Sequence, residues 1–397
     1  MKYNTAIFSA ALAVLLSSPM FADEPAKTSA AAKTDELTKE AQETVKELEA
    51  SYSEGSEPIA MLKHILKGSR LGPGEGWFGL AVSQTRFGWE HVAKSYDTDG
   101  DGKVSASEFT GSKGDFARLD RDGDGSLNET DFDWSEHSLS RSPGQMLFMQ
   151  ADRDGNGKLT SEEFAGLFKS LDRDEHGFVS LDELKDALQP PPAGAQAKRN
   201  DLPSRSTLIM GLKRQEIGSL QPGPSLDDDA PDFTLTSLDG KEVTLSDEVG
   251  DKPIVLVFGN FTCGPFRSQS GNIEKLYERY QDRAKFFLVY VREAHPSDGW
   301  WMTSNQRVGI ELPQPRNNNE RRDVAAMCQE HLDLKIPFLV DTVDDKVGAT
   351  YSGMPNRLYV IDRDGKIAFK NGRGPFGFHP RQLEQALVLL LNATAAK

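Results

Sequence analysis

The chain has 397 residues, and its 61 Asp and Glu residues outnumber its 46 Lys and Arg residues, which gives a formal net charge of −15 at pH 7. A chain of this length can form two or three domains, each with its own core. The negative charge disfavours binding to nucleic acid and to anionic membranes, and the 2 cysteines are too few for a scaffold held together by disulfide bonds.

Residues 1–22 have the three parts of a secretory signal peptide. Lys2 precedes the apolar run AIFSAALAVLL at 6–16, and the small residue Ala22 stands before the acidic sequence DEP. The run is too short to remain in a bilayer as a membrane span, and no later segment approaches the necessary length. We therefore expect cleavage after Ala22 and a periplasmic or secreted protein without a membrane span.

Residues 23–85 are predicted to be an N-terminal segment that is partly helical and partly disordered. The first residues, 23–34, have the composition of a disordered stretch. DELTKEAQETVKELEAS at 35–51 is typical of a polar, exposed helix. IAMLKHIL at 59–66 is a more apolar helix, which we expect to dock on the domain that follows.

The acidic block at 86–188 is predicted to be an all-α EF-hand domain. Four segments of 12 residues match the EF-hand calcium loop, namely DTDGDGKVSASE (97–108), DRDGDGSLNETD (120–131), DRDGNGKLTSEE (152–163) and DRDEHGFVSLDE (172–183). Calcium takes about six to eight oxygen ligands, so side-chain oxygens recur at fixed loop positions, one backbone carbonyl contributes, and a glycine allows the sharp turn. We expect Lys103, Ser126 and Lys158 to bind calcium through their backbone carbonyls. The full set of expected ligand residues is Asp97, Asp99, Asp101, Lys103, Glu108, Asp120, Asp122, Asp124, Ser126, Asp131, Asp152, Asp154, Asn156, Lys158, Glu163, Asp172, Asp174 and Glu183.

The loops differ in spacing and in ligand quality. Repeat spacings of 23, 32 and 20 residues indicate that loops one and two form one pair of hands and loops three and four another, each pair joined by a short β-bridge. Asp131 is shorter than the usual glutamate and His176 removes an oxygen ligand, so we expect the first and third loops to bind calcium most tightly. We expect structural or constitutively filled sites rather than a cytosolic-style switch, and the alternative to calcium binding is four solvated acidic turns. We interpret the apolar residues before the fourth loop as shared core rather than as a target groove: Phe164, Leu167, Phe168 and Leu171.

Residues 189–225 are predicted to be a linker. QPPPAGAQAKRNDLP at 189–203 is a proline-rich connector of the semi-rigid kind. A short helix follows at about 206–218, and PGPSLDDDAPDF then opens the last domain near residue 225.

Residues 226–397 alternate predicted strands and helices. The expected elements are a hairpin at 232–246, strands at 253–259 and 284–291, a helix at about 265–281, a loop at 294–320, a helix at 321–333, strands at 337–341, 357–362 and 367–370, and a final helix from Pro380. This order, with its closing hairpin and helix, predicts an α/β thioredoxin-like domain.

Cys263 lies at the predicted turn from a buried strand into a helix. Backbone N–H groups at a helix start favour a thiolate, so we expect a lowered pKa for this thiol. Phe266 stands where a thioredoxin has the second cysteine of its CxxC motif, so the site has a single thiol. Pro355, just before the strand RLYVID, occupies the position of the thioredoxin cis-proline, and we predict a cis Met354-Pro355 bond.

Four blocks, KPIVLVFGNFTCGPF, EAHPSDGWW, MPNRLYVI and NGRGPFGF, follow one another in this domain. They resemble the corresponding blocks of the iodothyronine deiodinases, including bacterial deiodinase-like proteins, and the resemblance covers about residues 230–392. It implies reductive removal of iodine from phenolic rings, and it makes a homodimer plausible. By resemblance, Cys263 is the nucleophile, which is usually selenocysteine in the family, and Glu293 and His295 belong to the active site. Arg357 matches an arginine that contacts the amino-acid end of the substrate.

Two positions depart from the family pattern. Phe261 stands where animal members have a cysteine, and Pro315 stands where the family has a second histidine. The expected mechanism is attack of the Cys263 thiolate on iodine or another soft electrophile, with His295 delivering or relaying the proton to the ring carbon. A second thiol, from Cys328 or from an external thiol reductant, then clears the sulfenyl product; the alternative for Cys328 is core packing.

Two further functions remain open from the sequence. A thiol peroxidase or disulfide reductase would use the same Cys263 and form a sulfenic acid. A calcium-binding interaction protein would use the thioredoxin-like domain only as a scaffold. Cys263 would then be inert to alkylation at neutral pH.

Overall fold

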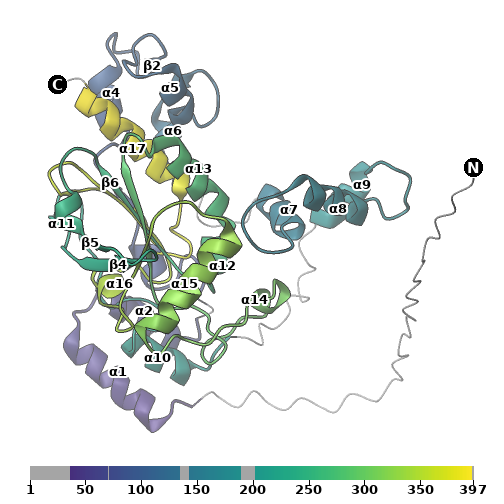
Figure 1. The fold of residues 1–397 in the computed structure, drawn as a ribbon, viewed down its shortest axis with the longest axis vertical. Helices are drawn as coiled ribbons and strands as arrows, with labels where there is room; N and C mark the ends of the chain where they lie inside the picture. Colours follow the sequence, from purple (N-terminus) through teal and green to yellow (C-terminus); the bar gives the residue numbers. More distant parts are fainter. Residues whose placement is uncertain (1–35, 70, 135–142, 189–201, 396–397) are drawn as a thin grey trace, which may run out of the picture. The chain divides into compact units, whose positions relative to one another are not determined.

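A computed structural model describes residues 36–69, 71–134, 143–188 and 202–395 (Figure 1). The expected signal peptide and the stretch 23–34 lie outside the described residues. Within the described part of the chain, no helix combines the length and the apolar character that crossing a membrane requires.

The centre of the fold is an eight-stranded sheet with the order β1-β10-β9-β6-β7-β8-β4-β5. Its innermost strand, β6, reads IVLVFG and is buried along its whole length, as expected for a strand covered on both faces. β6 pairs in parallel with β7, and β7 with β8, whereas β9 and β10 are antiparallel to their neighbours. The strand bounds are Gln84–Thr85 (β1), Thr234–Ser237 (β4), Glu242–Thr244 (β5), Ile254–Gly259 (β6), Lys285–Tyr290 (β7), Phe338–Val340 (β8), Arg357–Ile361 (β9) and Ile367–Lys370 (β10).

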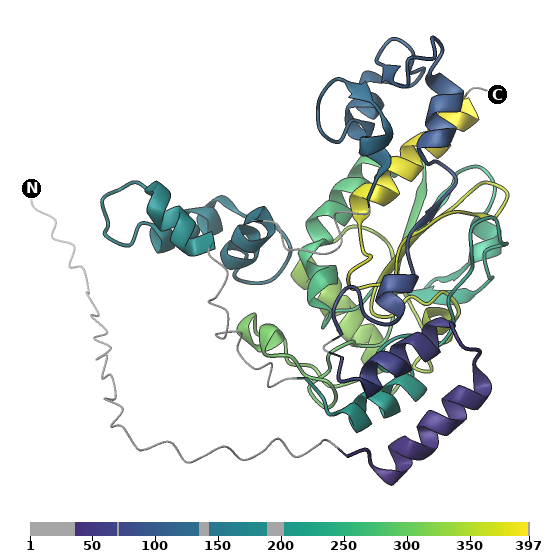
Figure 2. The same cartoon turned by 180° about the vertical axis from the view of Figure 1, so that it is seen from behind.

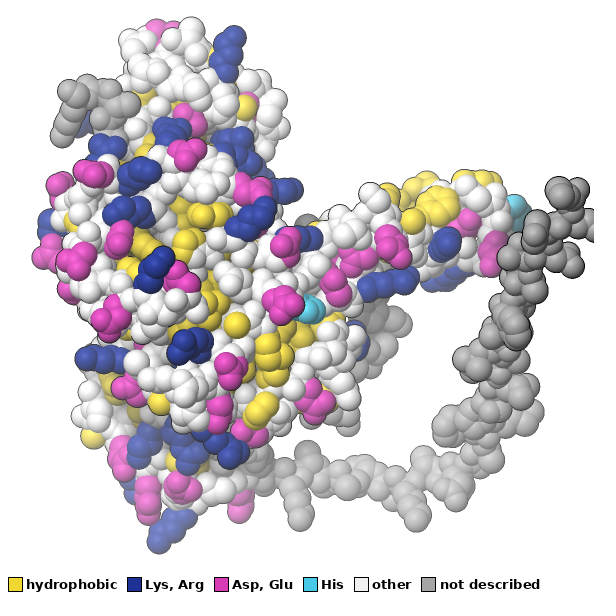
Figure 3. Space-filling model, in the orientation of Figure 1, with side chains coloured by type: hydrophobic (Ala, Val, Ile, Leu, Met, Phe, Trp, Pro, Cys, Tyr) yellow, Lys and Arg dark blue, Asp and Glu magenta, His cyan; other side chains and the backbone are white. Residues whose placement is uncertain are grey.

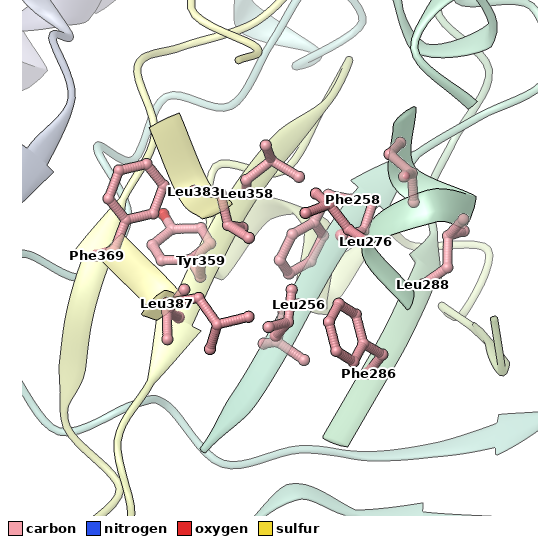
Figure 4. Packing of buried hydrophobic residues seen from close by; sticks show 14 of the residues in the cluster. Leu256, Phe258, Leu276, Phe286, Leu288, Leu358, Tyr359, Phe369, Leu383 and Leu387 are labelled. Atoms are coloured by element: carbon pink, nitrogen blue, oxygen red, sulfur yellow. The ribbon is translucent and has the colours of Figure 1, made fainter. Parts of the chain in front are cut away.

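The helices of this region are α11 (Leu245–Glu248), α12 (Gly264–Ser268), α13 (Ser270–Tyr280), α14 (Thr303–Arg307), α15 (Asn318–Leu332), α16 (Lys346–Thr350) and α17 (Pro380–Ala395). Figure 4 shows Leu276 of α13 and Leu383 and Leu387 of α17 packed over the sheet core around Leu256 and Phe258. Full burial of each such side chain contributes about 1.5–3 kcal/mol. The strands β7, β6, β9 and β10 with these helices make the thioredoxin-like α/β arrangement that the sequence predicts.

The single helix predicted at 265–281 is wrong in one detail, because it is broken at Gln269. The Gln269 N–H donates to Phe266 O, three residues back. The carbonyl that an α-helix would use, that of Pro265, accepts instead from the Ser268 hydroxyl at 3.0 Å. The chain therefore closes α12 with a tight turn and restarts as α13.

The first pair of EF hands consists of α4 (Trp89–Tyr96), β2 (Val104–Ser105), α5 (Lys113–Leu119), β3 (Ser126–Leu127) and α6 (Glu129–Phe132). Val104 pairs with Leu127, which is the expected bridge between the two loops. Apolar residues of this pair, such as Val92 and Phe116, belong to the same buried cluster as the sheet core. The strand β1 adds two residues to the edge of β10, so the region before the first hand also joins the sheet.

The second pair of hands contains α7 (Pro143–Ala151), α8 (Ser161–Leu171) and α9 (Leu181–Leu188). The interpretation of its aromatic residues as shared core is wrong for two of them, because Phe164 is 60% and Phe168 39% exposed, whereas Leu167 is buried. Phe164 and Phe168 are four residues apart and share one helix face, which no described element covers. Figure 3 shows apolar side chains gathered on this pair. Neither Leu159 nor Val179 takes part in a β-bridge in the described residues.

Four helices form a second apolar cluster, seen best from behind in Figure 2. They are α1 (Lys39–Ser51), α2 (Glu57–Leu66), α3 (Trp77–Leu80) and α10 (Arg205–Lys213), so the predicted linker contains a packed helix. The expectation that the helix at 59–66 docks on the EF hands is wrong, because its buried residues, such as Leu62, pack with those of α10. Arg373 forms a buried ion pair with Glu57 and links α2 to the loop after β10.

Candidate functional site

Cys263 lies at the end of β6, where the chain turns into α12. It is the N-cap residue of that helix, and its side chain is 1% exposed. The Asn356 side chain donates from Nδ2 to Cys263 Sγ at 3.2 Å. The preceding Met354-Pro355 bond is cis, as predicted. Cys263 is therefore a buried thiol with one amide donor against its sulfur.

The expected lowering of the Cys263 pKa is wrong. Burial raises the pKa of this thiol to about 11, because the thiolate loses its hydration. The Phe266 N–H, the positive charge of Arg267 and the Asn356 amide all act to lower this pKa, but their combined effect is smaller than that of burial. α12 has only 5 residues, so its dipole is small.

Arg267 fixes the loop that carries the cysteine. Its side chain is buried, and its guanidinium donates to Phe261 O and, at 2.8 Å, to Asn305 Oδ1. Asn305 Nδ2 in turn donates to Thr262 O at 2.8 Å. Both carbonyls just before Cys263 thus have buried donors, and burial lowers the pKa of the Arg267 guanidinium.

Glu293 also acts on the cysteine loop. Its carboxylate accepts from the Thr262 N–H at 2.8 Å and from the Tyr290 hydroxyl. The Tyr290 oxygen accepts the Phe261 N–H at 3.0 Å. Glu293 is 1% exposed, and burial raises its pKa. In this arrangement the side chain positions the backbone before Cys263 and is shielded from solvent.

His295 follows β7 and is tied to the loop of Cys263. Its backbone N–H donates to Thr262 Oγ1 at 3.0 Å, and the neighbouring Ala294 N–H donates to Asn260 Oδ1 at 3.1 Å. The ring Nδ1 lies 3.1 Å from Trp300 O, and the ring stands edge-on to the Trp300 indole. A carbonyl only accepts, so Nδ1 carries the proton and Nε2 is the basic atom of the neutral ring. Because β6 and β7 are parallel neighbours, Cys263 and His295 follow the same edge of the sheet.

Arg357 is the first residue of β9 and directly follows Asn356. Its guanidinium donates to Asn371 O and Pro222 O at 3.0 Å each. The side chain is 0% exposed. The structure therefore uses Arg357 to join β9 to the segment before the domain and does not bring it to the sulfur of Cys263.

Cys328 is buried in α15. Burial raises its pKa well above the usual value, and the charges of Glu293 and Arg267 act on it as they act on Cys263. The ring of Phe261, two residues before Cys263, contacts the ring of His331 in the next turn of α15. The two cysteines thus lie in one buried environment, and both are free thiols.

The four predicted calcium loops each bring their acidic residues together. In every loop three carboxylates place one oxygen each within 4.8 Å of one another: Asp97, Asp99 and Glu108; Asp120, Asp122 and Asp131; Asp152, Asp154 and Glu163; Asp172, Asp174 and Glu183. The glycine at position 6 has a positive φ in all four, at 82°, 87°, 74° and 84°. These oxygen donors and turns fit calcium. In the fourth loop, His176 Nδ1 lies 2.9 Å from Asp174 Oδ1.

The third loop touches the helix that follows Cys263. The Ser270 hydroxyl donates to Asn156 O, and Lys158 Nζ forms an ion pair with Asp333 at 3.0 Å. A Cβ added to Gly157 would lie 1.9 Å from Arg267 O. Only glycine fits at this close approach.

The sequence reasoning missed several residues of the site, namely Asn260, Arg267, Tyr290, Asn305 and Asn356. Arg267 lies one helical turn after Cys263, and that spacing is a usable signal. Asn356 follows the cis proline, whose position was recognised. Asn305 comes from a long loop, and no pattern in the sequence marks it.

The family model for iodothyronine deiodinase matches residues 192–389, and the EF-hand model matches 94–110 and 145–167, which hold the first and third loops. Type I iodothyronine deiodinase of Xenopus laevis is 30% identical over 155 residues, which are 39% of this chain and 59% of that protein. Thyroxine 5-deiodinase of Gallus gallus is 34% identical over 174 residues, 43% of this chain and 62% of that protein. Thyroxine 5-deiodinase of Homo sapiens is 34% identical over 134 residues, 34% and 42% of the two chains.

The chain therefore spans less than two thirds of each of these relatives. Among solved structures, a secreted Mycobacterium tuberculosis disulfide oxidoreductase is 16% identical with a TM-score of 0.30, and the match covers 40% of this chain and 96% of that one. A thiol:disulfide interchange protein from Bacteroides sp. is 17% identical with a TM-score of 0.31, and the match covers 43% of this chain and 91% of that one.

Fold and site define a single-thiol domain of thioredoxin-like architecture, preceded by EF-hand motifs. The C-terminal part of the chain, residues 192–389, belongs to the iodothyronine deiodinase family.

Proposed function

We propose that this protein is an exported, calcium-binding thiol oxidoreductase that removes iodine reductively from iodinated phenolic compounds, with Cys263 as the nucleophile. The observation that carries the proposal is the joining of the Cys263 loop to the His295 loop through Thr262 and Asn260. This arrangement holds a thiol and a basic ring nitrogen at one edge of the sheet in a deiodinase-family domain.

The reaction transfers two electrons from thiols to the carbon–iodine bond. The Cys263 thiolate attacks iodine in line with that bond, so a sulfur–iodine bond forms and the ring carbon takes the bonding pair. The proton that Cys263 gives up passes to the basic Nε2 of His295, which relays it to the ring carbon. A second thiol, from Cys328 or an external reductant, then attacks Cys263, which releases iodide and leaves a disulfide for the reductant to clear. Because burial raises the pKa of Cys263, the thiol has to lose its proton before it attacks.

A thiol peroxidase is the second candidate, and the burial of Cys263 favours it. Cys263 is 1% exposed, and a small peroxide can reach such a buried residue more readily than a two-ring phenol can. The product at Cys263 would be a sulfenic acid, resolved by a thiol as before.

One turnover assay separates these functions. The purified protein with dithiothreitol is given an iodothyronine, an iodophenol or hydrogen peroxide in parallel, beside Cys263→Ala and Cys328→Ala variants. We expect iodide release that is lost in Cys263→Ala. Peroxide consumption without iodide release would favour the peroxidase, and iodide release that survives Cys263→Ala would refute the mechanism.

Calcium binding is proposed for the first three loops, with the fourth weaker. Titration calorimetry after chelation is expected to show at least two sites and a rise in melting temperature, since a ligand that binds only the folded state stabilises it. A chelated protein with unchanged melting and no binding heat would contradict the proposal.

Export, cleavage after Ala22 and a homodimer are further proposals. Cell fractionation with sequencing of the mature N-terminus tests the first two, and sedimentation analysis tests the third.

A further inference from the structure

Among the described residues, Asn356 is the one side chain that hydrogen-bonds to the Cys263 sulfur. It is 0% exposed and stands between the cis proline and β9, with Nδ2 at 3.2 Å from Sγ. We propose that Asn356 is a catalytic residue that donates an N–H to the Cys263 sulfur and stabilises its thiolate form. This inference rests on the proposed function of Cys263 as a nucleophile and adds a residue that neither the motif nor the resemblance assigns.

The amide of Asn356 is held in place by the chain around it. Its Oδ1 faces the backbone of Gly374, because a Cβ at Gly374 would lie 1.8 Å from that oxygen and 2.4 Å from Asn356 O. The oxygen is buried and has no hydrogen-bond partner. On the other side, Pro355 O accepts from Asn260 Nδ2 at 2.9 Å. Gly374 thus lies directly against the amide, where a larger residue would not fit.

Three charged or polar groups act on the same sulfur. Arg267 contributes a positive charge, the Phe266 N–H a backbone dipole, and Glu293 a negative charge that opposes the thiolate. Arg267 donates its hydrogen bonds to Phe261 O and Asn305. Asn356 is therefore the neutral side-chain donor to this sulfur, beside the backbone N–H of Phe266, and its hydrogen bond strengthens when the sulfur becomes charged, since hydrogen bonds to a charged partner are stronger than those to a neutral one.

The donor serves two moments of the reaction. Its hydrogen bond stabilises the Cys263 thiolate before the attack. It stabilises the thiolate again when a second thiol displaces Cys263 from a disulfide. At the sulfenyl stage the sulfur is neutral and the hydrogen bond weakens. No electrons or atoms pass through Asn356.

The test measures the ionisation of Cys263 without any halogenated substrate. The purified full chain is alkylated with iodoacetamide over a pH series from neutral to strongly alkaline, and mass spectrometry quantifies the peptide that carries Cys263. The Cys328 peptide in the same digest is the internal control. The variants are Asn356→Ala and Asn356→Leu, where leucine keeps the branched shape without the N–H. Asn392→Ala, a half-buried asparagine of α17, is the matched control.

We expect the midpoint of the Cys263 pH profile to rise in both variants. At a pH below the midpoint the alkylation rate should fall about tenfold, which corresponds to about 1.4 kcal/mol. A merely structural role would change the plateau rate at high pH through altered access and leave the midpoint in place. An unchanged or lowered midpoint in the leucine variant, with wild-type melting, would overturn the proposal, as would a change in plateau alone.

The outcome is separable from that of the proposed function. If the midpoint of Cys263 alkylation rises in the Asn356 variants but the wild-type protein releases no iodide, the proposed role of Asn356 is supported and the proposed dehalogenation is refuted. If the wild-type protein releases iodide and the Asn356 variants keep the wild-type midpoint of Cys263 alkylation, the proposed role of Asn356 is refuted and the proposed dehalogenation is supported.

Discussion

Replacing Arg267 by methionine tests whether a buried guanidinium holds the loop of Cys263. Arg267 is 4% exposed and donates to Phe261 O and to Asn305 Oδ1. Methionine fills much of the space but leaves both oxygens without that donor, and each buried unsatisfied group costs about 1–3 kcal/mol. The substitution also removes the buried Nε of Arg267, which has no hydrogen-bond partner, and this gain offsets part of the cost. We therefore expect the free energy of unfolding to fall by about 2–4 kcal/mol.

The assay is chemical denaturation in saturating calcium, followed by tryptophan fluorescence. Arg322→Met, at an exposed position of the same α15 that carries Cys328, is the control, and exposed substitutions of this kind change stability by less than about 0.5 kcal/mol. Arg267→Met should also raise the midpoint of Cys263 alkylation, because a positive charge near the sulfur lowers its pKa. Equal stability of the two variants would refute the reasoning.

Three further predictions concern ionisation and calcium. The rate of Cys263 alkylation should rise with pH up to about 11, because a buried thiol whose pKa is raised stays protonated below that value; a plateau near neutral pH would contradict this. Glu163→Gln removes a carboxylate ligand of the third loop and should reduce the calcium stoichiometry by one in calorimetry, whereas Glu162→Gln next to it should not. Gly157→Ala should lower the melting temperature and calcium affinity, because the residue has φ +74° and a Cβ would meet Arg267 O; Gly144→Ala, with open space around it, should leave both unchanged.

Much of the fold follows from local patterns in the sequence. Continuous apolar runs identify β6 and β7, Asp239-Gly240 identifies the β4–β5 hairpin, and the EF-hand loops follow from ligand spacing. These features are readable because each depends on residues that are close in the chain.

The parts that were missed depend on contacts between distant residues. The first pair of hands, for example, shares the core of the sheet. The break at Gln269 is the exception, because the Ser268 hydroxyl donates to Pro265 O only three residues back. The pKa of Cys263 was expected in the wrong direction, because helix position is a local property whereas burial is a property of the whole fold. The resemblance assigns Arg357 to substrate binding, and only the tertiary structure shows that its guanidinium donates to Asn371 O and Pro222 O.

The short strand β1 decides where a shortened version of this protein can begin. Gln84 and Thr85 pair with Lys370 and Phe369 and cover the outer edge of β10. A fragment that starts at the predicted boundary of 226 would lack this cover, so β10 would expose unpaired N–H and C=O groups to other chains. Such a fragment would self-associate at the sheet edge, and the smallest soluble thioredoxin-like unit therefore has to include residues far upstream of its apparent first strand.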